Sequence, residues 1–155
     1  MMSSERKEIP QKVIFFMGAL IFSAAGGILL LVFDFGGWNG SNYYLGVYIW
    51  GGIDAWNSIY GIPIAISGFL LLYCAAISVL VLWFPEKIPH KIMVQIGFYA
   101  AALVFTLSLI GGIIFAVDME IEDVWWWFDA GFYGGIIGSA FTTVLYFLGL
   151  KNLEL

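Results

Sequence analysis

The side chains best suited to ion chemistry are acids concentrated in one short segment. Residues 118–123 hold four carboxylates in six positions. In an extended chain alternate residues share a face, so three of these carboxylates would project together, as the oxygen ligands of a hard cation such as Ca²⁺ do. However, the segment has no glycine to form a calcium loop, and charge runs are usually solvated. We therefore predict no metal site here. We predict instead a solvated outer acidic face, which consists of Asp34, Asp54, Asp118, Glu120, Glu122 and Asp123.

The other reactive groups occur singly. Cys74 is the only cysteine and His90 the only histidine, too few for a zinc site with nitrogen and sulfur ligands or for a haem held by two histidines. The sequence lacks both a phosphate-binding G-x-x-x-x-G-K-[ST] motif and an H-E-x-x-H motif. We expect no cofactor and no catalytic residue. Asn39 begins an Asn-Gly-Ser glycosylation acceptor and is a candidate modification site.

The composition shows which solvent surrounds these groups. Of the 155 residues, 62% are hydrophobic and 11% charged, whereas soluble domains carry about 25% charged residues. Four stretches contain no Asp, Glu, Lys, Arg or His, and each is long enough to cross a bilayer as a helix: about 13–33, 62–84, 92–117 and 131–150. The sequence therefore predicts an all-α membrane protein, a single domain (1–155) folded as a four-helix transmembrane bundle.

The basic residues predict the orientation of this bundle. All six fall on one side of the predicted spans, before the first, between the second and third, and after the fourth: Arg6, Lys7, Lys12, Lys87, Lys91 and Lys151. Basic residues favour the cytoplasmic side, so we expect both termini there, in the cell membrane. Six scattered cations do not form a patch for nucleic acid, so the expected partners are the lipid bilayer and a second copy or another membrane protein.

The connections differ between the two sides. The inner turn is short (85–91), whereas the outer loops cover 34–61 and 118–130. Residues 36–42 are typical of a turn and 43–50 of a strand, which predicts a small β-hairpin-like loop between the first two helices. If residues 125–127 are helical, their three tryptophans point in three directions. We predict interfacial aromatic side chains at Trp38, Trp50, Trp56, Trp125, Trp126 and Trp127.

Small residues in three of the spans predict close helix contacts. Gly134 and Gly138 form a G-x-x-x-G pair, and small faces let helix backbones approach one another. Packing within the bundle is the favoured interpretation, and an interface with a second copy or a partner is the alternative. The residues concerned are Gly26, Gly27, Gly111, Gly112, Gly134 and Gly138.

The layout resembles the claudin-like four-span (tetraspan) membrane proteins. The matching features are Trp38, the strand-like residues 43–50 and the short second outer loop. The resemblance implies four spans, cytoplasmic termini and a strand-forming first outer loop. The sequence departs from the claudin pattern because it lacks the two loop cysteines that follow a tryptophan motif there.

Three functions fit these observations. The favoured hypothesis is a non-catalytic tetraspan that acts in scaffolding, adhesion or assembly through its outer loops and small-residue helix faces. The first alternative is an accessory subunit of a larger membrane enzyme or transporter. The second is a passive channel or facilitator with an acidic outer vestibule. A lipid-modifying enzyme fits least, because no nucleophile–base set is evident.

Overall fold

The computed structural model describes residues 10–39, 43–46, 61–84 and 90–153, and four long helices dominate this part of the chain. They are α1 (Gln11–Val32), α3 (Gly61–Trp83), α4 (His90–Ile121) and α5 (Ala130–Leu153). Each is long and apolar enough to cross a membrane. The predicted four-helix transmembrane bundle is therefore confirmed, and the chain is an integral membrane protein.

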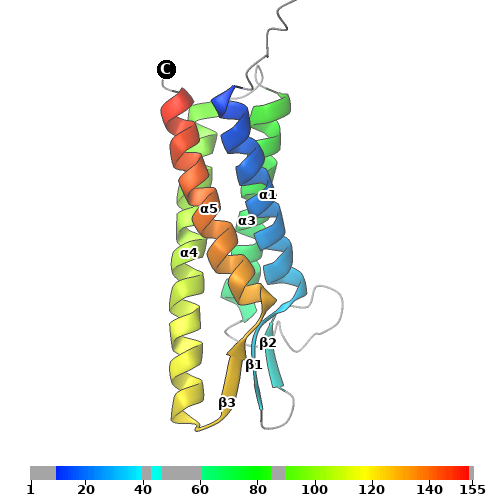
Figure 1. The fold of residues 1–155 in the computed structure, drawn as a ribbon, viewed down its shortest axis with the longest axis vertical. Coiled ribbons are helices and arrows are strands. Elements are labelled where there is room, and N and C mark those ends of the chain that lie inside the picture. The colour runs from blue at the N-terminus through cyan, green and yellow to red at the C-terminus, as the bar shows by residue number, and fades with distance from the viewer. Residues whose placement is uncertain (1–9, 40–42, 47–60, 85–89, 154–155) are drawn as a thin grey trace, which may run out of the picture.

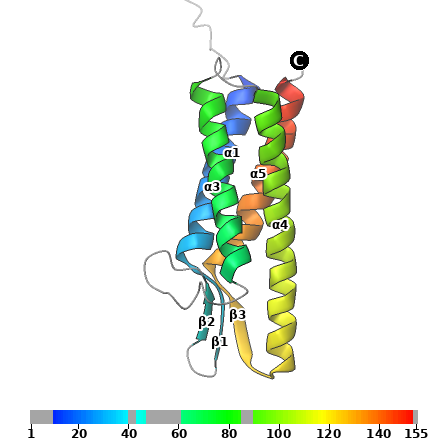
Figure 2. The same ribbon diagram turned by 180° about the vertical axis from the view of Figure 1, so that it is seen from behind.

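The helices run alternately up and down, and each packs against two neighbours (Figures 1 and 2). α1 contacts α3 and α5, and α4 contacts the same two helices from the opposite corner. Lys12 and Lys91 lie in the first turns of α1 and α4, and Lys151 lies in the last turn of α5. These three lysines therefore share one end of the bundle, called here the basic end. The strands occupy the opposite sheet end (Figure 1).

The ends of α1, α3 and α5 lie within about three residues of the predicted span limits. The predicted end of the third span, at residue 117, is wrong, because α4 continues to Ile121. Its 32 residues correspond to about 48 Å, well over the roughly 30 Å of a hydrocarbon core. α4 therefore extends past the start of α3 at the sheet end (Figure 2).

A Schellman motif ends α4 within the acidic segment 118–123. Asp123 takes the left-handed position with φ 53°, where glycine is usual. The Val124 amide donates to the Met119 carbonyl at 3.3 Å, and the Asp123 amide donates to the Glu120 carbonyl at 3.3 Å. The prediction that the second outer loop begins at residue 118 is therefore wrong, because Asp118 and Glu120 belong to a helix. In this helix the two side chains point in different directions, so the shared face considered for an extended chain does not form.

A three-stranded antiparallel sheet covers the sheet end of the bundle. Its strands are β1 (Asp34–Asn39), β2 (Tyr43–Gly46) and β3 (Trp125–Phe128), in the order β2-β1-β3. The β1–β2 pair confirms the predicted hairpin-like element between the first two long helices. The centre of the sheet is β1, whose Trp38 is opposite both Tyr43 and Trp126. Strands that precede α3 and α5 in the sequence therefore belong to one sheet.

The sheet differs from the predicted loops in two places. Residues 36–39, expected in a turn, belong to β1, because their backbone pairs with β2 and β3, and Gly36 leaves room for the Phe115 ring of α4. A Cβ on Gly36 would lie 2.7 Å from Cε1 of Phe115. The tryptophan run, predicted as part of the second outer loop, forms the edge strand β3, and pairing with β1 satisfies its backbone. Of the predicted strand 43–50, residues 47–50 lie outside the described residues.

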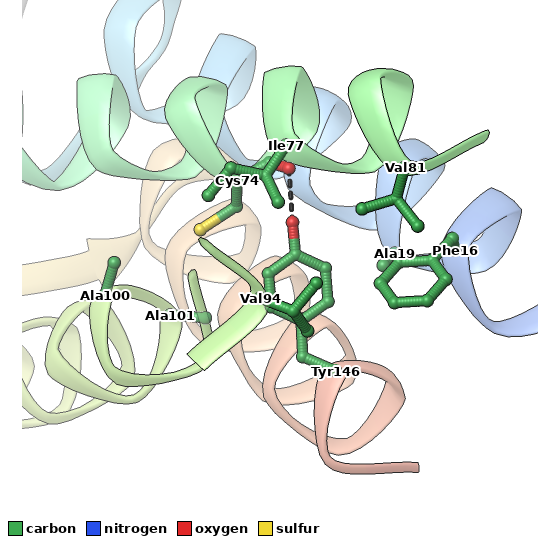
Figure 3. Packing of buried hydrophobic residues seen from close by; sticks show 9 residues of the cluster. All are labelled: Phe16, Ala19, Cys74, Ile77, Val81, Val94, Ala100, Ala101 and Tyr146. Atoms are coloured by element: carbon green, nitrogen blue, oxygen red, sulfur yellow. Dashed lines mark hydrogen bonds between the residues drawn. The ribbon is translucent and has the colours of Figure 1, made fainter. Parts of the chain in front are cut away.

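Buried side chains form one cluster in each half of the bundle. The cluster near the basic end centres on Phe16, Val94 and Tyr146, all fully buried (Figure 3). The cluster near the sheet end joins Leu30 and Val104 to Phe35, which enters from β1. Many large apolar side chains on the outer helix faces are exposed. Lipid is the solvent for these faces.

Candidate functional site

The strand β3 presents two different aromatic faces. Trp126 and Phe128 point toward α4, where the Phe115 ring meets Trp126 edge-on at 5.8 Å. Trp125 and Trp127 lie on the other face with their ring centroids 5.3 Å apart. This alternation follows from the two-residue period of a strand. Trp125 has 70% of its surface exposed, so the outer face of the sheet carries a large aromatic side chain.

The predicted acidic face divides into separate groups. Glu120 accepts a hydrogen bond from Nε1 of Trp126 at 3.0 Å and so links α4 to β3. Glu122 and Asp123 are exposed at the end of α4. Asp118 is half-buried and lines a cavity described below. Asp34 is the first residue of β1, opposite Gly46, and Asp54 lies outside the described residues.

The remaining loop predictions fall at the limits of the described residues. Asn39 ends β1 and pairs through its backbone register with Trp125 of β3. Gly40 and Ser41 of its glycosylation motif lie outside the described residues, as do Trp50 and Trp56. Within the described ranges, no three His, Cys, Asp or Glu side chains are grouped to hold a metal ion.

The predicted glycines bring α1 and α5 into backbone contact. A Cβ on Gly26 would lie 2.7 Å from the carbonyl oxygen of Gly134 and 3.0 Å from Cα of Gly138. A Cβ on Gly138 would lie 2.8 Å from Cα of Gly26. These three residues, called here the glycine seam, leave no room for side chains between the helices. In the monomer the G-x-x-x-G pair therefore faces the inside of the bundle.

The other predicted glycines contact different neighbours. Gly27 approaches α3, where a Cβ would lie 2.9 Å from the Gly68 carbonyl oxygen. Gly112 faces the ring of Phe132 on α5. Gly111 is open by comparison, because a Cβ there would find only Cζ of Phe35, at 3.7 Å. The six glycines thus serve three separate helix contacts and one open face.

A polar network joins three helices in the half of the bundle nearer the basic end, and Figure 3 shows its hydrogen bond between Tyr146 and Cys74. The Tyr146 hydroxyl donates to the Cys74 carbonyl oxygen and lies 3.0 Å from Oγ of Ser78. Cys74 in turn directs its Sγ to the Gly97 carbonyl oxygen at 3.4 Å. These contacts connect α5 to α3 and α3 to α4. They also satisfy polar groups that lipid and apolar side chains cannot satisfy.

An apolar cavity of about 260 Å³ lies between α3 and α4 in the half nearer the sheet. Leu30, Phe35 and Trp38 form its back and its sheet end, and Pro63, Ile64 and Ser67 line it from α3. The α4 side is lined by Leu107, Ser108, Ile110, Gly111, Ile114, Phe115, Asp118 and Met119. Ile110 and Ile114 are also exposed on the outside of the bundle. The cavity is therefore bounded by the lipid-facing surface of α4.

Ser108 differs from the other hydroxyls of the helices. Ser23 and Thr142 each donate to the carbonyl four residues earlier, both at 2.6 Å. Oγ of Ser108 is buried and has no hydrogen-bond partner in the part of the chain that the structure describes. It lies beside Gly135 of α5, where a Cβ would stand 2.6 Å from it. A buried hydroxyl without a partner is uncommon and costs stability.

The cavity and the Tyr146 network were not predicted from the sequence. In the sequence, Tyr146 lies 68 residues from Ser78 and 72 residues from Cys74. Only the packing of α3 against α5 brings these side chains together. One feature of the sequence marked the cavity: the carboxylate of Asp118 directly follows an apolar stretch. That feature pointed to a loop, because the helix was expected to end there.

No family model matches the chain, and no curated protein or solved structure is similar enough to count as a match. The resemblance to claudin-like tetraspans therefore remains one of layout.

Proposed function

We propose that this integral membrane protein is non-catalytic and acts in scaffolding, adhesion or assembly through its outer sheet. The observation that carries the proposal is the exposed aromatic face of β3, held on a sheet that joins both outer segments. Trp125 is 70% exposed at this face. Tryptophan is enriched among the residues that dominate protein–protein binding energy, and edge strands can pair with a further strand.

The sheet is held in place by contacts with the helices, which favours a binding role for it. β3 is fixed to α4 by the Trp126–Glu120 hydrogen bond and by the contact between Trp126 and Phe115. The stacked rings of Phe128 and Phe132, 3.8 Å apart, fix it to α5. A binding surface held in advance loses little conformational entropy when a partner arrives. The glycine faces contribute less to this proposal, because the glycine seam is already occupied within the monomer.

The charge distribution supports an extracytoplasmic position for the sheet. The described lysines lie at the basic end and the sheet end has none among the described residues. By the positive-inside preference, the sheet then faces outward and both termini face the cytoplasm. A partner would be a second copy or another membrane protein with a surface in the same membrane.

The test is native-membrane extraction with a polymer that keeps a lipid disc around the chain, followed by mass photometry and mass spectrometry. We expect a particle with at least one further protein chain, reduced about tenfold or more by Trp125→Ala. Trp83→Ala is the matched control, because Trp83 is also exposed but lies at the basic end.

Three outcomes decide between the candidates. A second copy of the chain, lost in Trp125→Ala, supports the assembly proposal. A foreign subunit in fixed stoichiometry that both variants retain replaces it with the accessory-subunit function. A lone monomer, or a complex equally reduced in both variants, overturns the role of the sheet.

A further inference from the structure

The cavity between α3 and α4 has the surroundings of a lipid site. Its lining is mostly apolar, and Ile110 and Ile114 belong both to its wall and to the exposed surface of α4. Water does not fill a cavity of this kind, because it would find few polar partners there. The molecules next to this surface are acyl chains of the bilayer. An alkyl chain is therefore the occupant that the lining favours.

The size of the cavity agrees with part of one chain. An apolar protein cavity of about 150 Å³ binds benzene, which has six carbons. On the same scale, the cavity of about 260 Å³ takes roughly ten carbons. Along α4 the lining runs from Leu107 to Met119, twelve residues apart, which corresponds to about 18 Å. The cavity is therefore elongated along the helix, as an alkyl chain in a bilayer leaflet is.

The sheet end of the cavity has a different character. The half-buried carboxylate of Asp118 lines it there, beside Trp38 and Phe115, whose ring centroids are 6.2 Å apart. A carboxylate next to aromatic rings attracts an organic cation through both its charge and the ring faces. The sequence has no Lys, Arg or His between residues 92 and 150, so no basic side chain of that segment neutralises Asp118. This end therefore matches an ammonium headgroup.

We propose that this cavity binds one bilayer lipid with an ammonium-bearing headgroup. One acyl chain lies between α3 and α4 with its end toward Ser108, and the ammonium group lies against Asp118, Trp38 and Phe115. The proposal does not depend on the assembly role of the sheet. The ligand of the cavity between α3 and α4 would then come from the surrounding membrane.

The test is native mass spectrometry of the full chain in lipid discs of defined composition. The discs contain equal amounts of phosphatidylethanolamine and phosphatidylglycerol with identical acyl chains, so that only the headgroup differs. We expect the wild-type chain to retain one phosphatidylethanolamine about tenfold more often than phosphatidylglycerol. Asp118→Asn should remove this preference, whereas Glu122→Gln, which removes an exposed carboxylate one turn further on, should keep it.

A second variant tests the chain-binding part of the cavity. Gly111→Leu places a side chain in the open space beside Phe35, and we expect retention of lipid to fall about tenfold. Gly111→Ala is the folding control, because its Cβ has ordinary contact distances. Both variants are first checked for an unchanged circular dichroism spectrum, and if Gly111→Leu is misfolded, Ile64→Phe fills the same cavity from α3.

Three results would overturn the proposal. The first is a wild-type chain that retains no lipid. The second is equal retention of the two lipids, and the third is undiminished retention by a folded cavity-filling variant.

Discussion

Glycines occur both where α1 meets α5 and where α4 faces α3, but the packing at the two places differs. The first pair of helices is in close contact, and a cavity lies between the second pair. In the glycine seam, Gly26 lies against Gly134 and Gly138, so the two backbones touch. On the other side, Gly111 of α4 meets only the edge of Phe35 and the rest of its surroundings is cavity. The seam glycines bring two backbones into contact because the facing residues are glycines as well. Large side chains can also fill the space beside a glycine, as Phe132 does at Gly112, but no side chain comes this close to Gly111.

The largest effect is expected from Gly138→Ala in the glycine seam. The new Cβ would lie 2.8 Å from Cα of Gly26 and 2.9 Å from the Phe22 carbonyl oxygen, and backbone atoms cannot rotate away. α1 must then move, so we expect the free energy of unfolding to fall by about 2–3 kcal/mol. Reversible unfolding in mixed micelles, followed by circular dichroism, measures this. A loss below about 0.5 kcal/mol would mean that the seam is not tightly packed.

The next effect concerns the polar network that joins α5 to α3. Tyr146→Phe removes the hydroxyl that binds the Cys74 carbonyl oxygen and contacts Ser78. We expect a loss of about 1–2 kcal/mol in the same unfolding assay. Tyr99→Phe is the control, because Tyr99 is exposed, and it should change stability little. If Tyr146→Phe and Ser78→Ala add independently in the double variant, the network interpretation is wrong.

Gly111→Ala should have the opposite sign to Gly138→Ala. The Cβ fits 3.7 Å from Cζ of Phe35, and alanine restricts the unfolded chain more than glycine does. We expect stability to rise by about 0.4–1 kcal/mol. This pair of identical substitutions is the most direct check of the comparison. A comparable loss at both positions would show that the two faces are equally packed.

The smallest effect is expected at Ser108. Ser108→Ala removes a buried hydroxyl without a described partner, so stability should be unchanged or rise by about 0.5 kcal/mol. Ser23→Ala, which removes a hydroxyl that donates to the Ala19 carbonyl, is the matched substitution and should lower stability slightly. A clear loss for Ser108→Ala would indicate a bonding partner for this hydroxyl.

The long helices could be predicted because lipid imposes two strong rules, apolar length and internal backbone pairing. The same rules do not apply outside the hydrocarbon core. There the charge of Asp118 and Glu120 suggested a loop, although their backbone continues α4 as far as the Schellman motif at Asp123. The helix end depended on that local motif and on β3, which holds Glu120 through Trp126.

Of the sites described above, the sequence predicted only the contact that depends on residue type alone, which is the one made by small residues. The small faces of Gly26 and Gly138 predicted a close helix contact, and the two residues lie against each other. The cavity could not be predicted, because it depends on which side chains of α3 face Gly111 and on where β1 places Phe35. The third strand depended on pairing between β1 and β3, which lie far apart in the sequence.

The direct joining of strands to helices has a mechanical consequence. β1 starts two residues after α1 ends, and β3 ends two residues before α5 starts. The Asp129 amide, between β3 and α5, donates to the Phe35 carbonyl of β1 at 3.1 Å. α1 and α5 are thus connected at two places. Their backbones touch where Gly26 meets Gly138, and the β1–β3 pairing links their ends at the sheet. A change in the angle between these helices would shear that pairing, so the sheet register and the helix crossing angle constrain each other across the membrane boundary.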